Sequence, residues 1–358
     1  MLKVYDQNHE PVGNLIRYRD LKLESELTTG DKKLTFKVSG TPDVPIHGQY
    51  FIRTRSDEFV VKNIGNNSKR KDVPYTAVLN LEDLVGNPFA SFSIYEQSMK
   101  EGMEMALEGT PWTLGECDIP DDDVRNGGLI NCDSLAAINA LCTIWMAEPE
   151  FDTLNKKVHI RKQRGSDKGV YFMAGLNLRN VEREENCDDF YTVLIPIGAD
   201  DLDISEVNDG LNYITDFSYS RIWKAYRWID ESYDDPQKLK DDGLEYLKEL
   251  AHPRVSMKCD VIDLAKQNSL YSVLAYQLGD YVTIIDPGTR VREKQRITKL
   301  IEYPATPWKN ECEMANHQPR FTEMLEKRKK AHDIEVFEGG GDIISLSQIL
   351  RELRKNNQ

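Results

Sequence analysis

The stretch YTVLIPIGADDLDISEVNDGLNYITD, residues 191–216, separates two differently organised halves of the chain. Within it, Val193–Ile197 is apolar and β-branched, which predicts a strand. Asp200–Asp203 is too acidic to be buried and predicts a solvated turn. Asp209-Gly210 is a turn signal before a second predicted strand, Leu211–Thr215. We interpret the stretch as a hydrophobic hairpin at a hinge between domains.

The composition is that of a globular chain with more than one core. The chain has 358 residues, of which 40% are hydrophobic and 30% are charged. Its formal net charge of −14 argues against sequence-specific binding of duplex DNA, which requires a cationic surface, but it is compatible with a surface that repels DNA. No apolar run approaches the roughly 20 residues that cross a bilayer, so we expect no membrane span.

The residues that usually carry chemistry are scattered. The six cysteines lie far apart, without a C-x-x-C pair or a histidine at ligand spacing, so we expect reduced thiols and neither a metal ion nor another cofactor. The zinc-protease, nucleophile-elbow, phosphate-loop and dinucleotide-binding motifs are missing from the sequence. No catalytic residue is therefore predicted.

Residues 1–100 read as short strands with regular turn signals. The clearest unit is a predicted hairpin, Gly48–Arg55 followed by Glu58–Ile64. Several short strands of this kind favour a small barrel or sandwich.

Residues 101–190 combine helix and strand. Asp133-Ser134 caps a predicted helix over Leu135–Met146, and a strand–turn–strand follows over residues 150–160. His159 alternates with apolar neighbours, so we expect it on the polar face of a strand in a structural role.

Residues 217–258 are predicted to be helical, over Ile222–Asp230 and Gln237–Leu250. The first of these segments carries Trp223, Tyr226 and Trp228. Such aromatic side chains can form a glycan-binding platform, although they more often belong to a core or a subunit interface.

A second predicted hairpin, Gln277–Ile285 followed by Lys294–Glu302, repeats the pattern of the first one. Both hairpins have a glycine, a β run, a polar turn and a β run that ends in Lys-x-Ile. The repetition predicts two related β domains that flank the other modules.

The C-terminal segment begins with a glycine joint, Gly339–Gly341, and continues as a predicted helix. Its apolar residues fall at heptad a and d spacing and are candidates for an oligomer interface: Ile343, Leu346, Leu350 and Leu353. A helix of this length could equally pack on its own protomer.

Several motifs occur in the order of a known family, over roughly residues 100–315. They are GTPWTLG at 109–115, FDTLNKKV at 151–158, AGLNL at 174–178, LIPIG at 194–198, VNDG at 207–210, and Leu278-Gly279-Asp280 with Arg296-Ile297. In this set the chain resembles the N-terminal structural module of siphophage tail-tip hub proteins, also called tail-associated lysins or the prophage tail endopeptidase family.

The resemblance implies a multidomain α+β fold similar to the baseplate hub proteins of contractile-tailed phages. Two β-barrel-like tube domains would comprise residues 1–100 and residues 195–216 with 257–318. An α+β domain would occupy residues 101–194, a helical insertion residues 217–256, and a linker with a helix residues 319–358. Three copies would form a ring of pseudo-sixfold symmetry.

The resemblance also implies a structural role without catalysis. The expected function is a trimeric hub at the tail tip of a phage or prophage, which closes the distal end of the tail tube and opens for DNA passage. Its partners would be two further copies of itself, the distal tail ring protein, the tape-measure protein and receptor-binding proteins, and it would be assembled in the cytoplasm of a bacterial host. The family's lytic domain lies C-terminal to this module, so we expect no enzyme in these residues. The alternatives are a peptidoglycan endopeptidase and a carbohydrate-binding module that uses Trp223, Tyr226 and Trp228.

Overall fold

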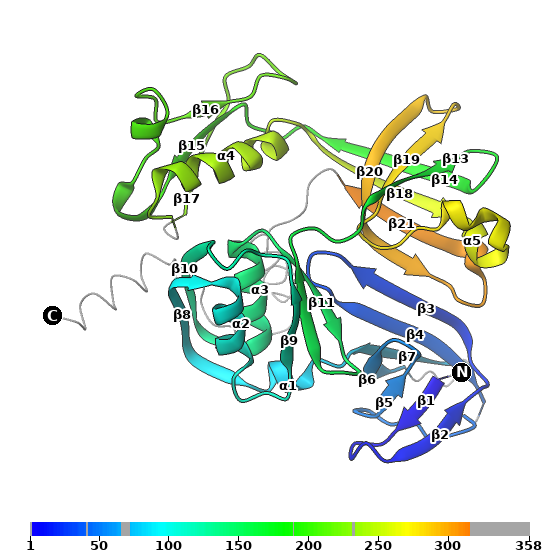
Figure 1. The fold of residues 1–358 in the computed structure, drawn as a ribbon. Coiled ribbons are helices and arrows are strands. Elements are labelled where there is room, and N and C mark those ends of the chain that lie inside the picture. The colour runs from blue at the N-terminus through cyan, green and yellow to red at the C-terminus, as the bar shows by residue number, and fades with distance from the viewer. Residues whose placement is uncertain (1, 41, 66–71, 189, 231–232, 316–358) are drawn as a thin grey trace.

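The computed structural model describes residues 2–40, 42–65, 72–188, 190–230 and 233–315. One sheet of 13 strands runs through the chain, from its first strand to its last described strand (Figure 1). The elements group into four units: an N-terminal half of the large sheet, a C-terminal half, a central module and an insertion.

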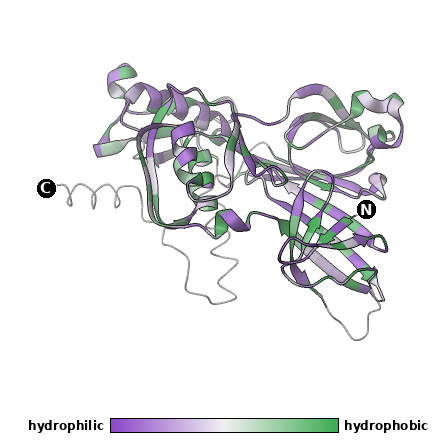
Figure 2. Ribbon diagram, turned by 60° about the horizontal axis from the view of Figure 1, so that its bottom comes forward, coloured by the Kyte–Doolittle hydropathy of each residue, from purple (hydrophilic) through white to green (hydrophobic). Residues whose placement is uncertain are grey.

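The N-terminal half (residues 2–79) contributes seven strands in the antiparallel order β3-β4-β7-β6-β5-β1-β2. They are β1 (Leu2–Tyr5), β2 (Pro11–Leu15), β3 (Arg19–Glu26), β4 (Lys32–Ser39), β5 (Phe51–Arg53), β6 (Glu58–Ile64) and β7 (Asp72–Leu79). The first predicted hairpin is confirmed, because β5 and β6 pair antiparallel. Along β4 and β7 buried residues alternate with more exposed ones, so that one face of these strands is buried. Figure 2 shows hydrophobic and hydrophilic residues mixed along the strands.

The C-terminal half contributes the other six strands. They are β13 (Asp167–Met173), β14 (Leu178–Asn186), β18 (Arg254–Val261), β19 (Tyr281–Asp286), β20 (Val291–Glu302) and β21 (Asn310–Ala315). The second predicted hairpin is confirmed as β19 and β20. The connections contain α5 (Leu264–Gln267) and two 3₁₀ segments, η3 (Ser269–Leu274) and η4 (Pro307–Lys309).

Strand β20 joins the two halves into one sheet. It pairs antiparallel with β3, from Lys299 opposite Glu26 to Glu302 opposite Leu23. Because backbone hydrogen bonds cross this seam, the two halves cannot separate without loss of a sheet ladder.

The central module (residues 82–161) packs three helices, one of them a single short turn, with short sheets. Its elements are α1 (Glu82–Val85), β8 (Pro88–Ser98), α2 (Met99–Leu107), β9 (Thr113–Cys117), β10 (Val124–Asp133), α3 (Ser134–Ile144), β11 (Glu148–Asp152) and β12 (Lys157–Arg161). The predicted helix after Asp133 is confirmed, and the Asp133 side chain accepts a hydrogen bond from the Ala136 N–H at 2.8 Å.

The insertion (residues 191–251) forms a small sheet covered by one helix. Its elements are β15 (Val193–Ile197), η1 (Ala199–Asp201), η2 (Ser205–Val207), β16 (Ile214–Thr215), β17 (Ala225–Ile229) and α4 (Pro236–Leu250). Strand β15 pairs antiparallel with β16 and parallel with β17. The predicted strand over Val193–Ile197 and the predicted helix after Pro236 are both confirmed.

The buried hydrophobic residues form three separate clusters. One cluster is shared by the N-terminal half and the central module, with members from Leu2 to Ile160. A second belongs to the C-terminal half, from Val170 to Met314, and the third to the insertion, from Leu194 to Ala251. The C-terminal half and the insertion therefore each have an apolar core of their own, whereas the N-terminal half and the central module share one.

The prediction of a helix over Ile222–Asp230 is wrong, because residues 225–229 form strand β17. Tyr226 and Trp228 face the core of the insertion, while Ala225, Arg227 and Ile229 are exposed. This alternation has the period of a strand, but over five residues it is too short to distinguish from a helical face in the sequence. The parallel pairing with β15 decides the conformation.

Several strands pair outside the unit in which the sequence placed them. Strand β8, expected with residues 1–100, pairs with β10 of the central module. Strands β13 and β14, expected in residues 101–194, pair with β19 and β18. Strand β15, expected with residues 257–318, pairs within the insertion. The pairing of β15 with β16 agrees with the hairpin expected over residues 191–216. The partners of β13 and β14 lie far away in the sequence, so the local pattern did not contain this information.

The strands described here form an open sheet rather than two closed barrels. The strand order runs without closure from β14 through the seam to β2. Mixed α and β structure is confirmed, whereas closed tube domains are not found among the described residues.

Candidate functional site: a charged sheet face and two polar joints

The structure does not assemble the predicted aromatic platform. Trp228 is 7% exposed and lies in the core of the insertion, with its ring centroid 5.4 Å from that of Tyr246. Tyr226 is half-buried on the same face of β17. Trp223 lies before the strand and is 58% exposed. The strand conformation is the reason, because it turns Tyr226 and Trp228 toward α4 and away from solvent.

The predicted oligomer residues Ile343, Leu346, Leu350 and Leu353 lie outside the described residues. Among the described residues, no group of three or more His, Cys, Asp or Glu side chains is placed to hold a metal ion. No helix in the described part of the chain is long and apolar enough to cross a membrane.

His159 lies on strand β12, where its Nδ1 accepts a hydrogen bond from the Glu116 N–H at 3.0 Å. This is a structural contact between β12 and β9, in agreement with the role predicted for His159.

The seam between the two halves carries a face of paired charges. Glu24 on β3 lies 2.9 Å from the Lys22 ammonium and 3.2 Å from that of Lys33 on β4. Lys299 on β20 approaches Glu26 at 3.2 Å across the seam. Partial burial raises the pKa of Glu24, but the hydrogen bonds from Lys22 and Lys33 outweigh it and leave the pKa below its ordinary value.

The same charged face extends into the C-terminal half. Along β18 and β21 the buried residues alternate with polar ones, and Lys258 pairs with Glu311 at 3.4 Å between the two strands. A shallow trough of about 500 Å³ lies over β14, β18, β20 and β21, with Glu182, Lys258 and Glu313 in its lining. A polar face that spans both halves of one sheet is suited to contact with water rather than with another apolar layer.

The first polar joint connects the central module to the C-terminal half. Arg296 on β20 makes a bidentate pair with Glu148 on β11, with N–O distances of 2.6 and 2.8 Å. The two side chains are only 10% and 6% exposed. Arg296 also donates to the backbone carbonyls of Gly279 at 3.0 Å and Arg164 at 2.5 Å, so the buried guanidinium is well satisfied.

Asp280 supports this joint from the neighbouring turn. Its carboxylate is fully buried and accepts hydrogen bonds from the Ser166 N–H, the Gln277 N–H and the Lys168 ammonium, at 2.9 to 3.0 Å. Gly279 and Gly165 lie in backbone contact beside it: a Cβ built on Gly165, whose φ is +72°, would stand 2.2 Å from the Gly279 carbonyl carbon. The motif Leu278-Gly279-Asp280 and Arg296 therefore both serve this one joint.

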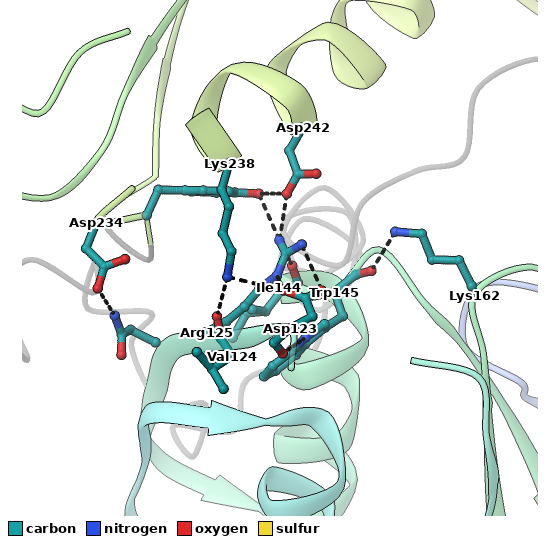
Figure 3. A network of polar contacts seen from close by, with 11 residues as sticks. Asp123, Val124, Arg125, Ile144, Trp145, Lys162, Asp234, Lys238 and Asp242 are labelled. Atoms are coloured by element: carbon teal, nitrogen blue, oxygen red, sulfur yellow. Dashed lines mark hydrogen bonds and ion pairs between the residues drawn. The ribbon is translucent and has the colours of Figure 1, made fainter. Parts of the chain in front are cut away.

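The second polar joint connects the central module to the insertion, as Figure 3 shows. Arg125 on β10 is 9% exposed and donates to the Asp242 carboxylate of α4 at 2.8 Å and to the Tyr233 hydroxyl at 3.1 Å. On its own side it contacts Asp123 at 3.1 Å and the Ile144 carbonyl at 3.0 Å. Arg125 thus links the two units through charged and hydrogen-bonded contacts on both sides.

Two further contacts flank Arg125 in the same joint. The Asn126 amide donates to Asp234 at 3.1 Å, and Lys238 donates to the Val124 carbonyl at 3.1 Å. Burial lowers the pKa of Arg125, but Tyr233 and the two aspartates outweigh it and the pKa is raised, so the guanidinium stays charged. Burial raises the pKa of Tyr233, which remains a neutral donor to Asp242 at 2.8 Å.

Sequence reasoning did not find the charged pairs of these joints. Glu148 and Arg296 are 148 residues apart, and Arg125 and Asp242 are 117 residues apart. A partial signal was present, since Asp280 and Arg296 belong to the motifs that carried the family resemblance.

The fold is that of prophage tail proteins. A prophage tail protein, gp18, from Listeria monocytogenes superimposes with a TM-score of 0.66 at 14% sequence identity, over 93% of this chain and 99% of that chain. A 43 kDa tail protein of prophage MuSo2 from Shewanella oneidensis gives 0.59 at 9% identity, over 88% of this chain and 96% of that chain. A tail protein from Neisseria meningitidis gives 0.59 at 8% identity, over 90% and 98%.

A family match agrees with this fold. Residues 166–325 match the family model described as "Prophage endopeptidase tail", so the resemblance to the prophage tail endopeptidase family is confirmed. No curated protein sequence matches the chain.

Proposed function

We propose that the chain is a structural component of a phage or prophage tail tip, and that three copies form a hub that closes the distal end of the tail tube and opens for DNA passage. The family match and the fold support a structural role in a phage tail. The proposed partners are two further copies of the chain, the distal tail ring protein, the tape-measure protein and receptor-binding proteins.

The continuous sheet is the observation that carries the proposal. A tube wall requires strands that follow one another around a ring, with a solvated face toward the lumen. Here the seam between β20 and β3 places the strands of both halves in one ladder, so each chain would supply two related segments of the wall. Three such chains would give the six segments of a pseudo-sixfold ring.

The charged face of this sheet fits a passage for DNA. Its carboxylates on β3 and β21, Glu24, Glu26, Glu311 and Glu313, lie beside lysines of β3 and the neighbouring strands, so the face carries charges of both signs without an excess of lysine. A passing duplex would meet no cationic patch to which its phosphates could adhere, and the net charge of −14 opposes adhesion further.

The solution mass tests the assembly. Light scattering coupled to size exclusion, over a range of concentrations, should give a mass near three chains, and negative-stain images should show threefold rings. A monomer at every concentration would contradict self-assembly of the chain into a hub.

A lytic function is the competing outcome for the same protein. Zymography on bacterial cell walls should show no lysis band from the purified chain. A band that disappears on substitution of a single carboxylate would overturn the structural role and favour a peptidoglycan endopeptidase.

A separate experiment tests whether the charged face of the sheet lines the passage. In the assembled ring, Glu311→Lys with Glu313→Lys should create affinity for duplex DNA that the unaltered ring lacks, measured by gel shift at low salt. The control is Glu104→Lys with Glu108→Lys, two exposed glutamates on and just after α2 of the central module, outside the large sheet. Equal DNA binding by both double variants would mean that the β21 face does not line the passage.

A further inference from the structure

The insertion is built as a body of its own. Its hydrophobic cluster, from Leu194 to Ala251, includes no residue of another unit. The described backbone hydrogen bonds of residues 191–251 also join residues within this segment, such as Tyr191 to Leu250 and Ala199 to Tyr233. The insertion can therefore keep its internal structure while its position relative to the other units changes.

The two connections of the insertion leave the large sheet side by side. The chain enters the insertion after β14, which ends at Asn186, and returns at Arg254, where β18 begins. These two residues are register partners in the antiparallel pair of β14 and β18. Because the two connections lie side by side, the insertion can rotate relative to the large sheet about this one point, which is the geometry of a hinge.

The contacts that hold the insertion against the central module are polar. Arg125, Asn126 and the Val124 carbonyl on β10 face Asp242, Asp234 and Lys238 on and before α4 (Figure 3). When such a contact opens, water replaces the lost partners, so the open and docked states differ far less in free energy than they would across an apolar interface.

The joint at Arg296 differs from this one. There the ion pair lies beside the backbone ladder of the sheet, and Arg296 itself belongs to a strand that continues through the seam. A side-chain substitution can weaken the joint at Arg296, but the backbone hydrogen bonds between β20 and β3 stay in place. At Arg125 the hydrogen bonds and ion pairs described between the two units all involve side chains.

We propose that the insertion is a hinged arm that the contacts of Arg125 hold docked on the central module. We call these contacts the Arg125 clamp: they join Arg125, Tyr233 and Asp242, with the pairs Asn126–Asp234 and Lys238–Asp123 at the rim. When the clamp opens, the arm swings away as a rigid body. The inference depends only on the contacts within one chain and holds whichever assembly the chain enters.

A zero-length cross-link measures docking directly. Lys238 Nζ lies 3.7 Å from Asp123 Oδ1 across the joint, so a carbodiimide can couple them only in the docked state. Lys100 and Asp121, 2.7 Å apart within the central module, provide an internal reference. Mass spectrometry of the full-length protein gives the ratio of the two cross-links.

The variant Arg125→Ala should lower that ratio at least fivefold and enlarge the radius of gyration in small-angle X-ray scattering. Its matched control is Arg161→Ala, which removes a partly exposed arginine whose partners, Glu116 and Asp118, lie in the same central module. The control should change neither quantity. Asp242→Asn keeps the shape of the clamp and should give a smaller decrease.

Hydrogen exchange in α4 separates arm opening from unfolding. In Arg125→Ala the amides in the interior of α4 should keep their protection, because the core of the insertion remains closed. An unchanged cross-link ratio and radius of gyration would overturn the proposal. Loss of protection throughout α4 would also overturn it, since the insertion would then be unfolding rather than swinging.

Discussion

The buried pair of Glu148 and Arg296 gives the sharpest test of how the units are held together. The substitution Glu148→Ala leaves the Arg296 guanidinium buried without its carboxylate and leaves the Arg164 N–H without the acceptor it has at 2.7 Å. Loss of one partner of a buried pair costs about 3–5 kcal/mol. Arg296 keeps its two carbonyl partners, so we expect the lower end, about 3 kcal/mol.

Native-state hydrogen exchange measures this cost locally, which suits a chain with several cores. Two amide hydrogen bonds report on the region, Gly279 N–H to Ile297 O and Ile297 N–H to Asp280 O, both of 2.9 to 3.0 Å. A cost of about 3 kcal/mol corresponds to roughly hundredfold faster exchange of these amides.

Two controls make the result interpretable. Asp167→Asn breaks the exposed pair with Lys294 in the same half and should leave the exchange unchanged. Replacing both Glu148 and Arg296 by Met removes both charges together and should restore much of the protection, because no buried charge is left unpaired. The reasoning is refuted if Glu148→Ala has no larger effect than Asp167→Asn, or if the double variant is as unstable as the single one.

Three further predictions concern packing, thiol reactivity and acid stability. Gly165→Ala should lower the unfolding temperature more than Gly175→Ala, because both glycines have positive φ, of +72° and +84°, but only Gly165 touches backbone; equal shifts would contradict the close contact. Burial raises the pKa of the Cys259 thiol to about 12, so at pH 8 it should react with Ellman's reagent only after unfolding, whereas the exposed Cys187 should react at once; equally fast modification of both would argue against a closed core. Burial raises the pKa of Glu58, but hydrogen bonds from its partners outweigh it and leave the pKa below 4.5, so its contribution to stability is present above pH 4.5 and is lost as the pH falls through the lower folded value. Glu58→Gln should therefore be less stable than the unaltered protein at neutral pH, with a difference that shrinks on acidification, and a constant difference in thermal scans from about pH 6 to pH 3 would refute this.

The local elements were largely predictable, and the reason differs from one to the next. The helix α3 follows a capping aspartate, Asp133, with apolar residues at helical spacing, and both signals lie within a few residues of each other. The hairpins β5–β6 and β19–β20 are local pairs with a polar turn between them. In each case the interacting residues are close in sequence, so the pattern contains the answer.

The sequence contained only a partial signal of the candidate site, through the family resemblance. Asp280 and Arg296 stand in motifs shared with tail-tip proteins, but their sequence neighbours do not indicate that Arg296 meets Glu148. The Arg125 clamp had no signal, since an arginine followed by Asn-Gly-Gly reads as an ordinary strand or turn. A pairing of charges across more than a hundred residues depends on how the units pack.

The sequence by itself determined the elements with short-range causes: the strand at Val193–Ile197, the capped helices, the hairpins and the family to which the motifs point. Only the tertiary structure decided that β20 joins β3, that β17 is a strand, and that Arg125 clamps the insertion to the central module. The physical reason is the range of the interactions. Capping, turn geometry and side-chain periodicity act within a few residues, whereas a sheet ladder or a buried ion pair forms only when distant segments meet and exclude water together.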